Sequence, residues 1–169
     1  MKKNKLSLRE TIMLLFLVVL LIEPFWRPLM ATIQGEDATS GSSPAGESIV
    51  CTVGVSVQPA LDNLDLMKEE SLALLPENGW MMEPVEMTVS EGTTCLEVLQ
   101  WACQEAKIPV VTSGDPPFVE SIGGLNNGDG GDVSGWTYTL NGEQLMVSAA
   151  IQTVQEGDEL VFSFACTWE

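Results

Sequence analysis

Histidine is absent from the 169 residues, and this absence removes most routes to catalysis. Without imidazole there can be no Ser-His or Cys-His nucleophile and no zinc site that uses histidine. The four cysteines show neither a C-x-x-C spacing nor a basic neighbour that would lower a thiol pKa. Acidic residues are abundant, but no pair is marked out as general acid and base. We therefore expect a protein that is not an enzyme.

Basic side chains are also scarce. Of seven Lys and Arg residues only Lys68 and Lys107 lie beyond Ala31, whereas most of the 24 acidic residues do. Such a surface repels nucleic acid and anionic lipid headgroups, so we expect no nucleic-acid partner. The excess of acid indicates either attraction of cations or of a basic partner, or simply high solubility outside the cell. Solubility is the simpler interpretation.

Long apolar runs are lacking too, because the run from Ile12 to Ile22 has only eleven residues. A helix needs about 20 apolar residues to span a bilayer. Four basic residues precede the run and Glu23-Pro24 follows it, a pattern typical of a secretory signal peptide. We expect residues 1–31 to be a signal peptide or an uncleaved membrane anchor. The protein would then be extracellular or at the cell surface, touching the membrane only through this segment.

Beyond the leader, composition divides the chain into a linker and one domain. Residues 32–48 are small, polar and interrupted by proline, as in a flexible linker. Residues 49–169 are enough for a single core. Alternating or periodic patterns predict strands at 49–57, 84–89, 118–122, 136–140 and 159–164, and helices at 62–75 and 94–107. The second helix begins with a capping box, Thr94 with Glu97. This order predicts an α+β domain in which one main helix crosses a small mixed sheet.

The cysteines could form disulfides if the protein is exported. Cys51 lies in the first expected strand and Cys166 at the last, so these two could be joined if the two strands are neighbours. Cys95 and Cys103 are eight residues apart on one helix, about 12 Å, and cannot pair with each other.

A glycine-rich loop occupies residues 123–135 and leads into the strand at 136–140. Its carboxylates do not fit a calcium loop of the EF-hand kind, because a start at Asn127 places Asp129 at position 3 but Gly131 at position 5. We expect a mobile loop and no metal. Asn141-Gly142 after the strand predicts a type I′ hairpin turn.

Four segments occur in an order that suggests a family: E-G-T-T-C-L-E-V-L-Q (91–100), F-V-E-S-I-G-G-L (118–125), S-G-W-T-Y-T-L-N-G (134–142) and Q-E-G-D-E-L (155–160). Together they resemble a bacterial domain of unknown function that is similar to the C-terminal domain of transcobalamin and intrinsic factor. The resemblance covers nearly all of residues 49–169. It implies a β-grasp-like fold, in agreement with the sheet and crossing helix expected above.

The same resemblance implies cobalamin or another corrinoid as ligand, since this domain closes over one face of the vitamin in the carriers. A corrin is a broad apolar disc rimmed with amides, so aromatic and amide side chains suit it. The candidate ligand-binding residues are Asn126, Asn127, Trp136, Tyr138 and Asn141. Alternatively, the two aromatic residues pack onto the helix at 94–107 as core.

Two functions therefore remain open from the sequence. One is an exported or surface-tethered module, without catalytic activity, that binds a corrinoid or a similar small molecule. The other is a cell-surface interaction or spacer module whose partner is a protein or the cell envelope.

Overall fold

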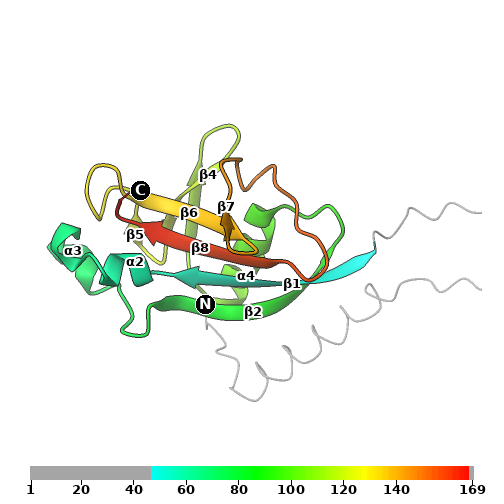
Figure 1. The fold of residues 1–169 in the computed structure, drawn as a ribbon, viewed down its shortest axis with the longest axis horizontal. Helices are drawn as coiled ribbons and strands as arrows, with labels where there is room; N and C mark the ends of the chain where they lie inside the picture. The colour runs from blue at the N-terminus through cyan, green and yellow to red at the C-terminus, as the bar shows by residue number, and fades with distance from the viewer. Residues whose placement is uncertain (1–46, 168–169) are drawn as a thin grey trace, which may run out of the picture. The chain divides into compact units, whose positions relative to one another are not determined.

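The computed structural model describes residues 47–167 (Figure 1). The expected signal peptide or anchor at 1–31 lies outside these residues, as does almost all of the expected linker at 32–48. Within residues 47–167, no helix combines the length and the apolar character needed to cross a membrane.

The main sheet has five strands in the order β2-β1-β8-β6-β7. Their bounds are β1 (Ser48–Ser56), β2 (Trp80–Ser90), β6 (Gly135–Leu140), β7 (Glu143–Gln144) and β8 (Glu159–Ala165). β1 runs parallel to β8, whereas the other neighbours are antiparallel. A second sheet of three short strands contains β3 (Val110–Ser113), β4 (Phe118–Ile122) and β5 (Leu125–Asn126). The expected α+β class with a mixed sheet is confirmed.

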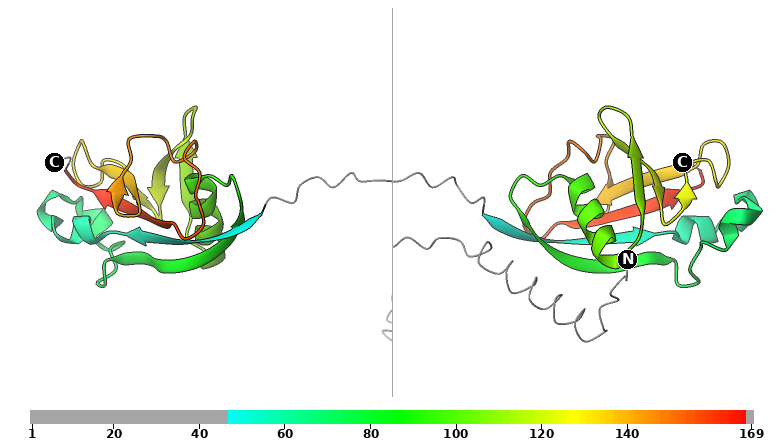
Figure 2. Two further views of the ribbon diagram at one scale, coloured as in Figure 1. Left: turned by 45° about the vertical axis from the view of Figure 1, so that its right-hand side comes forward. Right: turned by 180° about the vertical axis from the view of Figure 1, so that it is seen from behind.

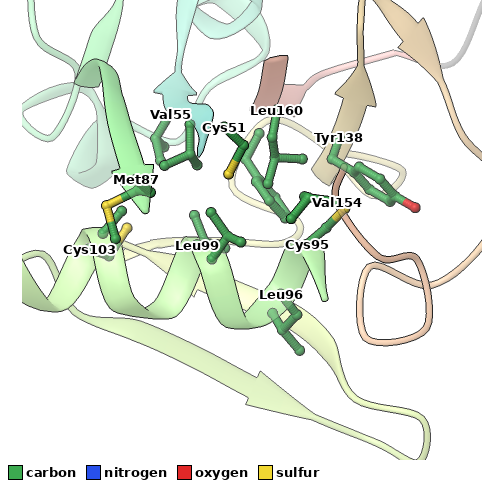
Figure 3. Close-up of a cluster of buried hydrophobic side chains, with 14 of the residues drawn as sticks. Cys51, Val55, Met87, Cys95, Leu96, Leu99, Cys103, Tyr138, Val154 and Leu160 are labelled. Carbon is green, nitrogen blue, oxygen red and sulfur yellow. The ribbon is translucent and has the colours of Figure 1, made fainter. Parts of the chain in front are cut away.

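Helix α4 (Cys95–Ala106) crosses one face of the main sheet, and the β3–β4 hairpin rises beside it (Figure 2). Its capping box is present, since Glu97 N–H donates to Thr94 Oγ1 at 3.3 Å and Thr94 N–H donates to Glu97 Oε2 at 2.9 Å. The hydrogen bond from the Thr94 backbone lowers the pKa of Glu97. Buried side chains of α4, among them Leu99, face the strands and form the main core (Figure 3).

A smaller core lies at the C-terminal end of β8. It contains Val57, Ala60, Met67, Leu125, Phe164 and Cys166. The chain around Met67 forms three short helices, α2 (Gln58–Leu61), the 3-10 helix η2 (Leu64–Leu66) and α3 (Glu69–Leu72). The prediction of a single helix over 62–75 is therefore wrong. The break follows from two contacts: Met67 is buried in the small core, and extended Lys68 donates its N–H to Asp129 O at 2.8 Å.

Strand β2 is an edge of the main sheet and the longest strand described, with eleven residues. Pro84 lies in its middle, where it has no N–H to offer another strand. Exposed Glu83 and Glu86 flank this proline. Both features hinder the addition of a further strand at this edge.

The predicted disulfide between Cys51 and Cys166 is wrong for this structure, in which all four cysteines are free and buried. The two strands are neighbours, as the prediction required. However, they are parallel, with Thr52 opposite Glu159 and Ser56 opposite Ser163. Cys51 and Cys166 therefore lie at opposite ends of the pair, on the order of 25 Å apart at about 3.3 Å per residue. A disulfide tolerates a Cα separation of roughly 7 Å at most.

We predict four free and unreactive thiols in the native protein. Burial raises the pKa of Cys95 to about 12 and that of Cys103 to about 11, so neither forms a thiolate at pH 8. A thiol reagent such as Ellman's should react slowly with the folded chain and with all four cysteines after unfolding without reductant. Release of two equivalents instead of four would reveal a disulfide and contradict the structure.

Candidate ligand-binding cleft

An open cleft of about 290 Å³ lies beside β6. Three segments of the chain form its walls. One is the beginning of β4 with the turn before it (116–119), the second is the middle of β6 (136–138), and the third runs from the last residue of β7 into the irregular segment that follows (144–149). Phe162 of β8 also lines the cleft. The volume is close to the lower limit of about 300 Å³ that is usual for small-molecule pockets.

Tyr138 connects two of these walls. Its ring stacks on Phe162 of β8, with centroids 5.6 Å apart, and its hydroxyl donates to Val147 O at 2.8 Å. Burial raises the pKa of Tyr138 to about 12, so the hydroxyl stays protonated and remains a donor at neutral pH. A second hydrogen bond joins the wall segment at 144–149 to the one at 116–119, since Ser148 Oγ donates to Pro117 O at 3.2 Å. The side walls, although irregular, are thus fixed by hydrogen bonds.

Apolar side chains around the cleft are left in solvent. Met146 is 91% exposed and Phe118 is 53% exposed, and Val147 beside them is exposed too. All three line the cleft. Large apolar side chains gathered around a concavity are more informative than scattered ones, because they often mark a ligand or partner site.

Trp136 is packed within the protein and also reaches the cleft. Its ring packs edge-on against Phe164 at 5.4 Å, and its Nε1–H donates to Leu125 O at 2.9 Å. It contacts the main core and the small core. The residue nevertheless remains partly exposed and lines the cleft, so it is a fixed part of the wall.

The three predicted asparagines do not line the cleft, and their amides are engaged within the protein. Asn127 donates to Val119 O and accepts from Trp136 N–H, both at 2.9 Å. Asn126 donates to Gly124 O at 3.0 Å. Asn141 donates to Asp158 Oδ1 at 2.8 Å. These side chains hold loops and a turn in place, and of the five predicted residues Trp136 and Tyr138 line the cleft.

Sequence reasoning missed Phe118, Met146 and Val147. Phe118 belongs to the strand expected at 118–122, and no helix or strand is expected over 145–154. One signal was present: Met146 lies only four residues after Gly142 of the hairpin turn, so a chain that returns along β6 brings Met146-Val147 near its aromatic residues.

The carboxylate of Asp129 is one of the groups that hold the glycine-rich loop at 123–135, together with the side chains of Asn127 and Ser134. Asn126 N–H donates to Asp129 Oδ2 at 2.9 Å, and Lys68 Nζ lies 3.0 Å from Asp129 Oδ1. Burial alone would raise the pKa of Asp129, but the hydrogen bonds from Asn126, Lys68 and Ser71 outweigh it and lower the pKa. The loop that was expected to be mobile is therefore fixed by hydrogen bonds and an ion pair. Across residues 47–167, no three Cys, Asp or Glu side chains are grouped to hold a metal ion.

Comparisons with known proteins support the fold. Residues 92–165 match a family described as Domain of unknown function (DUF4430). The structure is similar to that of haptocorrin in complex with Cbi, with a TM-score of 0.53 and 18% sequence identity. This match covers 75% of the chain but only 27% of haptocorrin. The transcobalamin-like fold expected from the sequence is confirmed.

A second solved structure is that of a candidate metal-binding protein from Ruminococcus gnavus ATCC 29149. The two structures give a TM-score of 0.43 at 16% sequence identity. The match covers 71% of the present chain and 99% of the Ruminococcus gnavus chain. Among curated proteins, no match is found.

We predict that Asp129→Asn destabilises the fold by about 1–3 kcal/mol, the usual effect of breaking buried hydrogen bonds to one group. Since the folded-state pKa is lowered below its ordinary value of 3.8, the carboxylate's contribution is full above that pH and is lost as the pH falls through the folded-state pKa. Thermal melts from pH 7 to pH 2 should show less acid destabilisation in the variant.

Asp132→Asn is the matched control, because Asp132 is exposed in the same loop. Equal melting temperatures for the two variants would show that Asp129 does not hold the loop.

Proposed function

We propose that the chain is an exported, non-catalytic module that binds one apolar portion of an amphipathic small molecule in the cleft, with a corrinoid as first candidate. The observation that carries this proposal is the exposure of Phe118 and Met146 at the rim of a cleft whose inner wall is aromatic. Covering these side chains with a ligand removes apolar surface from water, at about 25 cal/mol per Å².

The size of the cleft limits how much of a ligand it holds. A volume of about 290 Å³ accommodates one edge or substituent of a large molecule, and the remainder would lie across Phe118 and Met146. Haptocorrin, whose structure contains Cbi, has a similar fold. The chain spans about a quarter of haptocorrin's length, so binding by this domain alone would be weak unless a partner completes the site.

The chemistry of the chain agrees with binding rather than catalysis. Histidine is absent, and the cysteines are buried with raised pKa values. The cleft itself offers aromatic, aliphatic, hydroxyl and amide groups, none of which is activated as a nucleophile.

A second candidate function, as a protein-interaction module, is favoured by another surface. Two hollows of about 340 and 440 Å³ share Ile108 just beyond the end of α4. Leu74 and Trp80 line one hollow, and Trp101, which is 43% exposed, lines the other. An extended apolar surface of this kind suits a partner chain better than a small molecule.

We predict that cyanocobalamin causes a saturable change in tryptophan fluorescence of the full chain, after correction for absorbance, because Trp136 lines the cleft. Phe118→Ser and Met146→Ser should each weaken binding by about tenfold, since each removes roughly 1.5 kcal/mol or more of apolar burial. Val85→Ser is the matched control: Val85 is an exposed valine on β2 that does not line the cleft.

Absence of any saturable change up to millimolar corrinoid would reject the corrinoid as ligand. Equal loss of affinity in all three variants would reject the cleft as the site.

A further inference from the structure

Two exposed carboxylates are next in sequence to residues that line the cleft. Asp115 directly precedes Pro116, and Glu143 directly precedes Gln144, at two of the three wall segments. Both acidic residues are exposed. Neither has a basic partner among the ion pairs of residues 47–167, where Lys68 with Asp129 is the single pair.

Basic side chains lie elsewhere. Residues 47–167 contain only Lys68 and Lys107, and neither lines the cleft. Lys68 is bound to Asp129 in the glycine-rich loop. Lys107 is the C-cap of α4, whereas the first residues of that helix contact the wall segment, with Leu96 N–H donating to Ala149 O at 2.9 Å. The twelve residues of α4 therefore place Lys107 about 18 Å along the helix from the end near the cleft.

The N-terminus of α4 is the remaining source of positive potential near the cleft. Its N–H groups are already engaged: Cys95 N–H donates to Gln152 O, Leu96 N–H to Ala149 O, and Glu97 N–H to Thr94 Oγ1. The carboxylate of Glu97 also lies at this end, where it accepts from Thr94 N–H. An anionic ligand would thus find no charged or free backbone donor from this helix end.

We propose that the cleft selects cationic amphipathic ligands: an apolar or aromatic group enters the cleft, and a positive charge stays at the rim near Asp115 and Glu143. This inference rests on the proposed function and adds the charge of the ligand to it. A concave site with low-dielectric walls and charges of one sign at its rim concentrates the opposite ion and excludes the like one.

The test compares two probes that share one apolar body and differ in charge, a naphthylmethyl trimethylammonium ion and a naphthylmethyl sulfonate. Calorimetric titration of the full chain at about 20 mM salt should give binding of the cation about tenfold tighter than that of the anion. The ratio should fall toward one at about 0.5 M salt, where charges at an exposed rim are screened.

Substitution then assigns the selectivity to the rim. The double variant Asp115→Asn, Glu143→Gln should bring the ratio close to one while the affinity for an uncharged naphthyl alcohol stays unchanged. The matched control is Glu83→Gln, Glu86→Gln on β2, which removes two exposed carboxylates that do not flank the cleft and should keep the ratio.

The outcomes separate the two proposals. If neither charged probe nor the alcohol binds, the cleft is not a small-molecule site and the proposed function fails as well. If all three bind alike, the cleft binds but the charge selectivity is wrong. A ratio that falls equally in the double variant and in the control would trace selectivity to the net charge of the whole domain and overturn the assignment to Asp115 and Glu143.

Discussion

The parallel pairing of β1 with β8 is the constraint on which the rest of the structure depends. It places the first and the last strand of the domain side by side in the middle of the sheet, so β6 and its short partner β7 form one side. A parallel pair needs a long connection, and here nearly the whole domain is that connection. Helix α4 lies within it and covers the sheet, and the cleft forms where this cover ends, beside β6.

Local signals in the sequence were sufficient for the elements that they describe. The strand β1, the capping box at Thr94 and the Asn141-Gly142 turn are each predicted from residues a few positions apart, and all three are present. Asn141 and Gly142 both have positive φ, 55° and 79°, as a type I′ turn requires. The α+β class followed from these elements.

The features that the sequence did not predict depend on contacts between residues far apart in the chain. Asn127 looked available for a ligand, but its amide is shared between Val119 and Trp136, which only the folded chain brings to it. The sequence left open whether the strand at Cys51 is a neighbour of the last strand, and no local pattern distinguishes parallel from antiparallel pairing. Likewise, the helix expected over 62–75 does not form, because Met67 is buried in the small core that contains Phe164 of β8.

The proline in β2 has a consequence for molecules held at high local density. An unprotected edge of eleven residues would be a template on which further copies could polymerise through their backbones. Pro84 and its two flanking glutamates make that growth unfavourable from the edge itself. Backbone pairing at the β2 edge is therefore disfavoured even among crowded copies, and any association between them would use another surface.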